Sequence, residues 1–175
     1  ESRGLGDVYK RQGYEDSGKG YDFLREAVAG YYKSFGVTVS PEEVLISDGA
    51  KSDCGNIGDI LDVDNVIAVC DPVYPVYVDS NAMAGRAGDY DAEAERWTNI
   101  TYMPTTAENG FCPALPKGRA DVIYLCSPNN PTGTVYTAET IRAVGQLLTR
   151  KGEEYGHPIY ILADEPYREL VYGGV

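Results

Sequence analysis

Four short segments of the chain carry side chains that could do chemistry, and each follows an apolar stretch: residues 47–51, 71–75, 129–133 and 164–167. The first joins glycine and lysine at the expected start of a helix, where free N–H groups favour phosphate. The others offer a tyrosine between two prolines, amides in a rigid turn, and a carboxylate three residues from a phenol. Each segment alone is more often a plain turn, a packing aromatic or a helix cap. Together they suit a phosphorylated aromatic cofactor.

The apolar stretches before these segments are predicted to be strands, at residues 44–47, 66–70, 121–126 and 159–163. They are nearly continuous apolar runs rather than alternating ones, which is typical of a parallel sheet covered on both faces. Helical patterns lie between them, so the predicted fold class is α/β, a mostly parallel sheet with helices on both faces. Ligands of such sheets bind beyond the carboxyl ends of the strands. The four segments should therefore meet there.

An amphipathic helix is predicted near the start of the chain from apolar residues at helical spacing: Leu24, Ala27, Val28, Tyr31 and Tyr32. Arg25 and Glu26 are expected to face water. Residues 40–43 read as a capping box with proline at the first helical position, which predicts a single helical turn.

Two further helices are predicted between the strands. One covers residues 50–61, with its inner face formed by Ile57, Ile60 and Leu61. The other begins after the capping residue Thr137, and its inner stripe consists of Ile141, Val144, Leu147 and Leu148. Residues 79–120 show less periodicity and include a loop rich in Thr, Asn, Gly and Pro.

Composition excludes several classes of function. The chain has 175 residues and a net charge of -12, which argues against nucleic acid or an anionic membrane as a partner, because both usually need a basic face. The four cysteines form no CxxC pair, so they are expected to be reduced and structural, as in a cytoplasmic protein. With a single histidine, His157, no metal site is expected. No apolar run reaches the length of a membrane span.

The two ends of the chain suggest that it is a part of something longer. Residues 1–12 resemble translated sequencing-adapter sequence and are predicted to be a non-native leader. Residues 13–175 are then expected to be a partial domain, truncated before its C-terminal part and before a second, smaller domain.

The motifs LREAVAGYY, SDGAK, DPVYPVY, SPNNPTG and ADEPY occur in this order. In type and order they resemble the class I and II aminotransferases, which are fold-type-I enzymes dependent on pyridoxal 5'-phosphate. The resemblance implies the large, cofactor-binding domain, with an amino acid and a 2-oxo acid as substrates. It also implies a homodimer for the full-length relative.

The resemblance assigns the cofactor phosphate to Gly49, Ala50 and Lys51, and assigns stacking on the pyridine ring to Tyr74. Lys51 is thus a phosphate-site residue and not the family's Schiff-base lysine. That lysine lies downstream of the D-x-x-Y segment in the family and has no counterpart in this chain. The fragment is therefore expected to be inactive.

The resemblance also assigns two catalytic residues, Asp164 and Tyr167. Asn130 and Tyr167 would bond the phenolic oxygen of the cofactor, and Asp164 would pair with its ring nitrogen. An ionised Asp164 would keep that nitrogen protonated, so that the ring can accept the electrons left when the substrate Cα–H bond breaks.

Two parts of the chain resemble different members of the family. Residues 42–135 resemble LL-diaminopimelate aminotransferases, which serve lysine biosynthesis, whereas residues 147–175 are more similar to aspartate- and aromatic-type aminotransferases. A chimeric assembly joined near the NNPTG turn is the favoured explanation, and a natural divergent enzyme is the other. A cofactor-sensing domain of a transcription regulator is a further alternative. A nicotinamide-binding domain is disfavoured because no GxGxxG follows the first strand.

Overall fold

The computed structural model describes residues 18–114, 116, 118–170 and 172. It divides into two compact units, Glu1–Gly49 and Ala50–Val175. The leader predicted at residues 1–12 lies outside the described residues. Among the described residues, no helix is long and apolar enough to cross a bilayer.

The first unit consists of helix α2 (Asp22–Ser34) and the short 3₁₀ turn η1 (Pro41–Glu43). The predicted helix is confirmed, and so is the capping box. The Ser40 hydroxyl accepts a hydrogen bond from the Glu42 N–H at 3.2 Å, and the Glu43 carboxylate accepts one from the Ser40 N–H at 2.8 Å. These two bonds satisfy N–H groups that the start of a helix leaves without partners.

The prediction that Arg25 faces water is wrong. Its side chain is buried and donates to the Pro41 carbonyl at 3.0 Å, while its guanidinium pairs with Asp22 at 2.5 Å and with Glu42 at 3.5 Å. A long apolar stem and a charged tip allow arginine to pack beneath a turn while its guanidinium stays paired with carboxylates. Hydrophobic periodicity carries no signal for such a contact.

The strand predicted at residues 44–47 is also not confirmed. These residues lie between η1 and α3 in the sequence without strand pairing, and the Ile46 N–H donates to the Lys19 carbonyl at 2.8 Å. Val44 is buried, whereas Leu45 is 73% exposed. An apolar run as short as residues 44–47 does not distinguish a strand from an extended connection.

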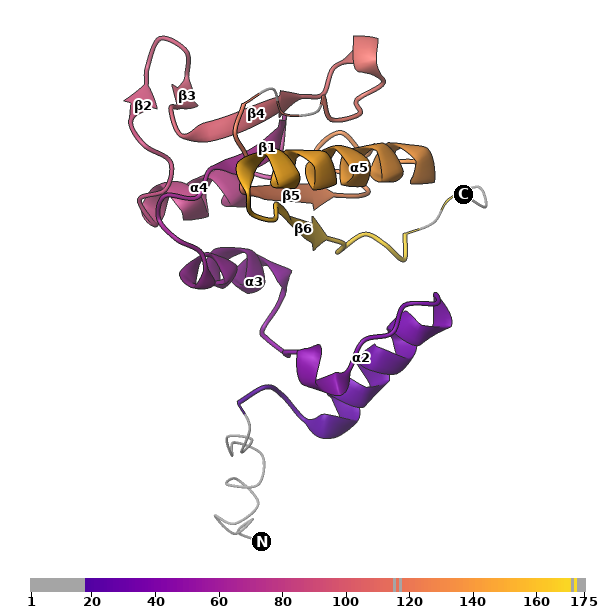
Figure 1. The fold of residues 1–175 in the computed structure, drawn as a ribbon. Coiled ribbons are helices and arrows are strands. Elements are labelled where there is room, and N and C mark those ends of the chain that lie inside the picture. Colours follow the sequence, from indigo (N-terminus) through magenta and orange to yellow (C-terminus); the bar gives the residue numbers. More distant parts are fainter. Residues whose placement is uncertain (1–17, 115, 117, 171, 173–175) are drawn as a thin grey trace, which may run out of the picture. The chain divides into compact units, whose positions relative to one another are not determined.

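The second unit is built on a parallel sheet of four strands in the order β4-β1-β5-β6 (Figure 1). The strands are β1 (Ile67–Asp71), β4 (Ile100–Pro104), β5 (Val122–Cys126) and β6 (Tyr160–Asp164), and every pairing between them is parallel. The α/β class, the parallel sheet and three of its strands are confirmed. Strand β4 and a small hairpin of β2 (Tyr90–Asp91) with β3 (Arg96–Trp97) lie in the stretch where no element was predicted.

Helices lie on both faces of this sheet, as predicted. They are α3 (Ala50–Asn56), continued by the 3₁₀ turn η2 (Ile57–Ile60), then α4 (Val76–Met83) and α5 (Ala138–Tyr155). A further 3₁₀ turn, η3 (Ala107–Asn109), follows β4. The Thr137 side chain caps α5 by accepting from the Thr140 N–H at 3.1 Å, which confirms its predicted capping role.

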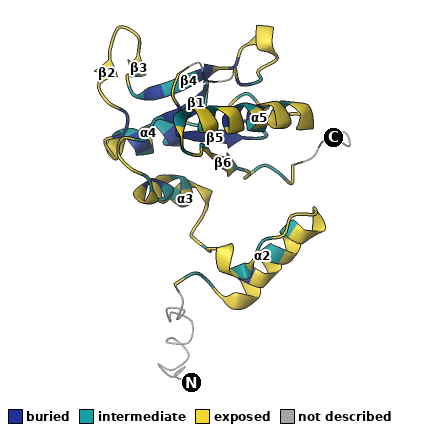
Figure 2. Ribbon diagram, viewed as in Figure 1, coloured by how far each residue is buried: buried dark blue, intermediate teal, exposed yellow. Residues whose placement is uncertain are grey.

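The sheet divides the core into two clusters, and side chains alternate between them along each strand. Residues 68, 70, 123 and 125 face α5, where Val144 and Leu148 are buried. Residues 67, 69, 122, 124 and 126 face the other way, where Tyr77 of α4 is completely buried. Figure 2 shows the buried residues concentrated in the sheet and the exposed ones on the outer faces of the helices.

Two predicted core positions are wrong. Ile60 is 79% exposed, because the helix predicted over residues 50–61 changes to 3₁₀ geometry at Ile57 and its inner face rotates. Ile141 is 42% exposed in the first turn of α5. The neighbouring apolar positions Ile57, Leu61 and Leu147 are half-buried.

Candidate functional site

A cavity of about 150 Å³ lies in the second unit, beyond the carboxyl ends of β5 and β6. Its lining residues are Ala50, Lys51, Tyr74, Tyr77, Cys126, Asn130, Asp164, Pro166 and Tyr167. Every residue predicted to bind the cofactor, apart from Gly49, is in this lining. Gly49 is the last residue of the first unit, and its predicted role stays a prediction.

The parallel sheet explains why residues so distant in sequence lie around one cavity. Tyr74 follows β1, Asn130 follows β5 and Asp164 ends β6, and these strands are neighbours in the sheet. The carboxyl ends of parallel strands lie at the same edge, so each strand contributes the residues that follow it.

Asp164 is the carboxylate of the cavity, and it is held by a residue that the sequence reasoning did not single out. The Tyr77 hydroxyl donates a hydrogen bond to Oδ2 of Asp164. Burial, followed by this hydrogen bond, raises the pKa of Tyr77 well above its usual range, so the phenol stays a neutral donor. The signal in the sequence was its spacing: Tyr77 follows Tyr74 by three residues, across the turn at Pro75 that begins α4, and the Tyr77 N–H donates to the Tyr74 carbonyl at 3.3 Å.

Three tyrosine rings form the wall behind this carboxylate. The ring of Tyr77 stacks on that of Tyr124 with a centroid distance of 4.8 Å and an interplanar angle of 22°. Tyr74 meets Tyr77 edge-on, at 5.7 Å and 84°. Tyr77 and Tyr124 are buried, whereas Tyr74 is half-buried and lines the cavity. The inner pair thus fixes the outer ring, which keeps a surface for a ligand.

Two donors predicted to share one oxygen of the cofactor lie next to each other. The side-chain amide of Asn130 donates to the hydroxyl of Tyr167 at 3.4 Å. This long bond brings an amide and a phenol from two different strand ends to the same side of the cavity. An oxygen between them could accept from both.

The turn that carries Asn130 is stabilised by its neighbour Asn129. The Asn129 side chain donates to the Thr132 hydroxyl at 2.8 Å, and its backbone N–H donates to the Thr134 carbonyl at 2.9 Å. The Gly133 N–H returns to the Asn129 carbonyl at 2.7 Å. The two asparagines therefore differ: Asn129 is buried and structural, whereas Asn130 lines the cavity.

Ala50 and Lys51 enter the cavity from the beginning of α3, which packs against α4. Lys51 is exposed and is the cation among the lining residues. A lysine and the Asp164 carboxylate in one lining match a ligand that carries an anionic group and a protonated ring.

The thiols near the cavity have raised pKa values. Burial raises the pKa of Cys126, whose Sγ lies 3.2 Å from the Pro128 carbonyl. Burial, and then the negative charges of Asp164 and Asp53, raise the pKa of Cys54 to about 11. Since the thiolate is the nucleophilic form, neither cysteine is a candidate for covalent catalysis.

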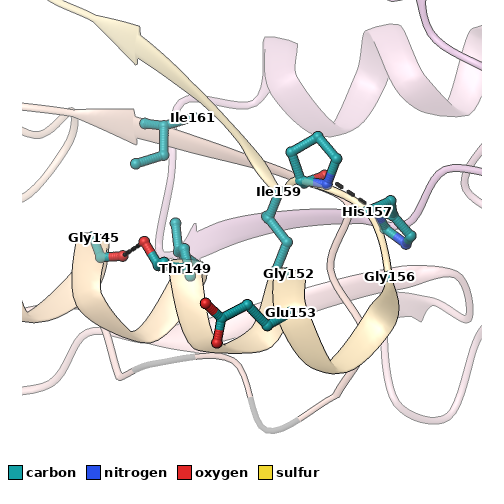
Figure 3. Close-up of a pocket in the computed structure, with 10 residues that line it drawn as sticks. Gly145, Thr149, Gly152, Glu153, Gly156, His157, Ile159 and Ile161 are labelled. Atoms are coloured by element: carbon teal, nitrogen blue, oxygen red, sulfur yellow. Dashed lines mark hydrogen bonds between the residues drawn. The ribbon is translucent and has the colours of Figure 1, made fainter.

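A larger hollow, of about 650 Å³, lies between the C-terminal half of α5 and β6 (Figure 3). Its wall is mainly apolar, with Ile159 and Ile161 on one side, and the Thr149 hydroxyl is already bonded to the Gly145 carbonyl at 3.0 Å. The polar groups are too few to orient a substrate, so size alone does not make it the site. Among the described residues, no group of three metal-binding side chains lies together.

The family model for aminotransferases of class I and II matches residues 10–175. The chain belongs to this family. Its members depend on pyridoxal 5'-phosphate, which fits the ring, carboxylate, amide and cation that surround the cavity. The fold-type-I architecture expected for the family is the one observed.

Curated relatives are similar over most of the chain. The LL-diaminopimelate aminotransferase of Lachnospira eligens is 61% identical over 124 residues, which are 70% of this chain and 31% of that protein. The corresponding enzyme of Agathobacter rectalis is 56% identical over 134 residues, 76% of this chain and 33% of that protein. The chain therefore spans about a third of the length of the curated relatives it matches.

Solved structures show the same fold. The L,L-diaminopimelate aminotransferase of Chlamydomonas reinhardtii superposes with a TM-score of 0.72 and 36% identity, over 91% of this chain and 38% of that one. The aspartate aminotransferase of Thermus thermophilus with maleate gives a TM-score of 0.69 and 28% identity, over 89% and 38%.

Proposed function

We propose that the cavity residues bind pyridoxal 5'-phosphate in an aminotransferase that exchanges an amino group between an amino acid and a 2-oxo acid. The observation that carries the proposal is the convergence of Tyr74, Asn130, Asp164 and Tyr167 from three strand ends on one cavity. Packing alone does not require a carboxylate, an amide and a phenol to face the same small space. Family membership supplies the reaction class.

Each lining residue has a distinct task in this proposal. Tyr74 stacks on the pyridine ring and limits its tilt, and Lys51 with Gly49 and Ala50 binds the phosphate. Asn130 and Tyr167 donate to the phenolic oxygen and stabilise its negative charge. Asp164 accepts a hydrogen bond from the ring nitrogen and keeps the proton there, because an adjacent anion favours the protonated form. When bound, the cofactor takes up the electrons released at the substrate Cα.

We propose LL-diaminopimelate aminotransferase, an enzyme of lysine biosynthesis, as the activity of the whole protein. Support comes from the identities of 61% and 56% with enzymes of that name. An aspartate- or aromatic-type activity is the second candidate, favoured by residues 147–175 and by the aspartate aminotransferase fold match. The whole protein would be a cytoplasmic homodimer by the same resemblance, which light scattering of the full-length protein tests.

The decisive experiment measures cofactor binding and transamination separately in a variant of Asp164. Asp164→Ala in the full-length protein is expected to reduce transamination far more than it reduces cofactor binding, because Asp164 acts on the ring nitrogen and the phosphate contacts remain. Asp71→Ala is the matched control: Asp71 also ends a strand, but it pairs with Arg96 at 2.9 Å and does not line the cavity. Near-normal turnover of the Asp164 variant would defeat the assignment.

The substrate is tested by comparing amino donors. Full-length protein should use LL-diaminopimelate with glutamate's 2-oxo acid as acceptor, and it should use aspartate and phenylalanine poorly. A preference for either of those two amino acids would support the second candidate instead.

A further inference from the structure

We infer that Tyr77 is a positioning residue for the cofactor's ring nitrogen, acting through Asp164. The inference rests on the proposed cofactor site. Tyr77 does not need to touch the cofactor to do this, because its hydroxyl donates to Oδ2 of Asp164. Among the described residues, no other donor is bonded to this carboxylate, so its second oxygen is left for a ligand.

The position of the Tyr77 hydroxyl is fixed by packing on every side. Its ring has no exposed surface, stacks on Tyr124 and meets the edge of Tyr74. The Asn81 side chain donates to the Tyr77 carbonyl at 2.8 Å and to the Tyr124 hydroxyl at 3.4 Å, which ties the backbone of α4 to the stacked pair. A donor held in this way constrains the carboxylate that it binds.

Asp164 needs such a constraint because its own strand provides little. The residues of β6 are exposed or half-buried, and Asp164 itself is half-buried at the end of the strand. Without Tyr77, its carboxylate could rotate toward water. A carboxylate held beside the ring nitrogen favours the proton on that nitrogen, because an adjacent anion stabilises the protonated ring.

The two buried tyrosines of this wall thus have different roles. The Tyr77 hydroxyl determines where the Asp164 carboxylate lies, whereas Tyr124 contributes its ring to the stack and no bond to Asp164. Removing the Tyr77 hydroxyl should reduce protonation of the cofactor's ring nitrogen, whereas removing the Tyr124 hydroxyl should not change it. The two residues are buried tyrosines in one stacked pair, so they form a matched comparison.

The test uses the full chain with pyridoxamine phosphate labelled with ¹⁵N in its ring, in wild type, Tyr77→Phe and Tyr124→Phe. Circular dichroism first establishes that each variant is folded. Tyr77→Phe should bind pyridoxamine phosphate about tenfold more weakly, the size expected for loss of one hydrogen bond to a charged group. Its ring ¹⁵N resonance should move toward the neutral pyridine position. Tyr124→Phe should match wild type in both measurements.

Unchanged affinity and an unchanged ¹⁵N resonance in Tyr77→Phe would overturn the inference while leaving the cofactor site in place. If wild type itself does not bind pyridoxamine phosphate, the proposed site and the inference both fail. If a variant does not fold, a measurement on the wild-type protein still tests the inference. The hydroxyl proton of Tyr77, protected by burial, should shift when pyridoxamine phosphate binds to wild type, and a fixed resonance would overturn the inference.

Discussion

The guanidinium of Arg86 donates a hydrogen bond to the carbonyl of Gly58, joining the segment after α4 to η2. The same side chain donates to the carbonyls of Leu61 at 3.0 Å and Asp62 at 3.2 Å. Arg86 is buried, and its guanidinium bonds to these backbone carbonyls. A cation near the C-terminal end of a helical segment is favourable, because it interacts with the negative end of the helix dipole. Within the second unit, the contact joins η2, which continues α3, to the segment that follows α4.

Replacing Arg86 by methionine should destabilise the chain by about 3 kcal/mol, because the carbonyls of Gly58, Leu61 and Asp62 lose a charged donor. Urea unfolding measures this loss. Hydrogen exchange should also become faster at residues 50–61, more than in the sheet. The control is Arg142→Met on the exposed face of α5, which should change stability by less than about 0.5 kcal/mol. Equal stability of the two variants would show that Arg86 is not an anchor.

Cys54 should react slowly with iodoacetamide at pH 8.5 and faster as the pH approaches 11. Burial and the nearby carboxylates raise the pKa of its thiol to about 11, so the folded chain keeps the proton over a range where the unfolded chain loses it. The stability linked to this group is complete below pH 9 and falls as the pH rises from 9 to 11. Mass spectrometry after timed labelling reports the rate, with Cys112 as internal reference. Labelling of Cys54 at the rate of a free cysteine at pH 8.5 would contradict the raised pKa.

The strands and their carboxyl-end residues were predictable because both signals are local. A buried parallel strand needs an uninterrupted apolar run, and the residues after it stand at the edge where ligands bind. The apolar runs at residues 66–70 and 121–126 therefore predicted β1 and β5. They also predicted that Tyr74 and Asn130, which follow these strands, lie at one site. Strand β4 was missed, since it carries threonine and proline and occupies the edge of the sheet as described.

Contacts between distant polar side chains could not be predicted in the same way. Tyr77 and Asp164 are 87 positions apart, and only the fold brings them within hydrogen-bonding distance. Arg25 looked like a surface residue because periodicity ranks side chains by polarity, whereas its burial depends on the carbonyl of Pro41. Hydrogen bonds of this kind depend on tertiary geometry that a pattern of apolar residues does not encode.

Gly145 in the interior of α5 and Gly156 at its C-cap should respond to alanine in opposite directions. Gly145 lies inside the helix with open space where a Cβ would be, so Gly145→Ala should stabilise the chain by about 0.5–1 kcal/mol. Gly156 ends the helix with a φ of 76°, which L side chains rarely adopt. Gly156→Ala should destabilise by about 1 kcal/mol. Thermal unfolding compares the two, and a change of the same sign in both would refute the assignment of the helix end.

The buried carboxylate of Asp121 connects the amino ends of three strands, at the edge of the sheet opposite the cavity. It accepts from the Val66 N–H at 2.7 Å, and it pairs with Arg119 at 3.0 Å and with His157 at 3.3 Å. Its backbone continues the connection, because the Tyr160 N–H donates to its carbonyl at 2.9 Å. His157 therefore has a structural role, as a partner of the Asp121 carboxylate.

Asp121→Asn should therefore lower the free energy of unfolding by about 2 kcal/mol, since one charge that serves several donors is removed from a buried position. The amide also turns a donor toward Val66 or Arg119, where only an acceptor fits. Cofactor affinity should stay unchanged, because the carboxylate is at the far edge of the sheet. Asp59→Asn, at an exposed position, is the control and should be neutral in urea unfolding. A loss of affinity without a loss of stability would mean that Asp121 serves the site rather than the fold.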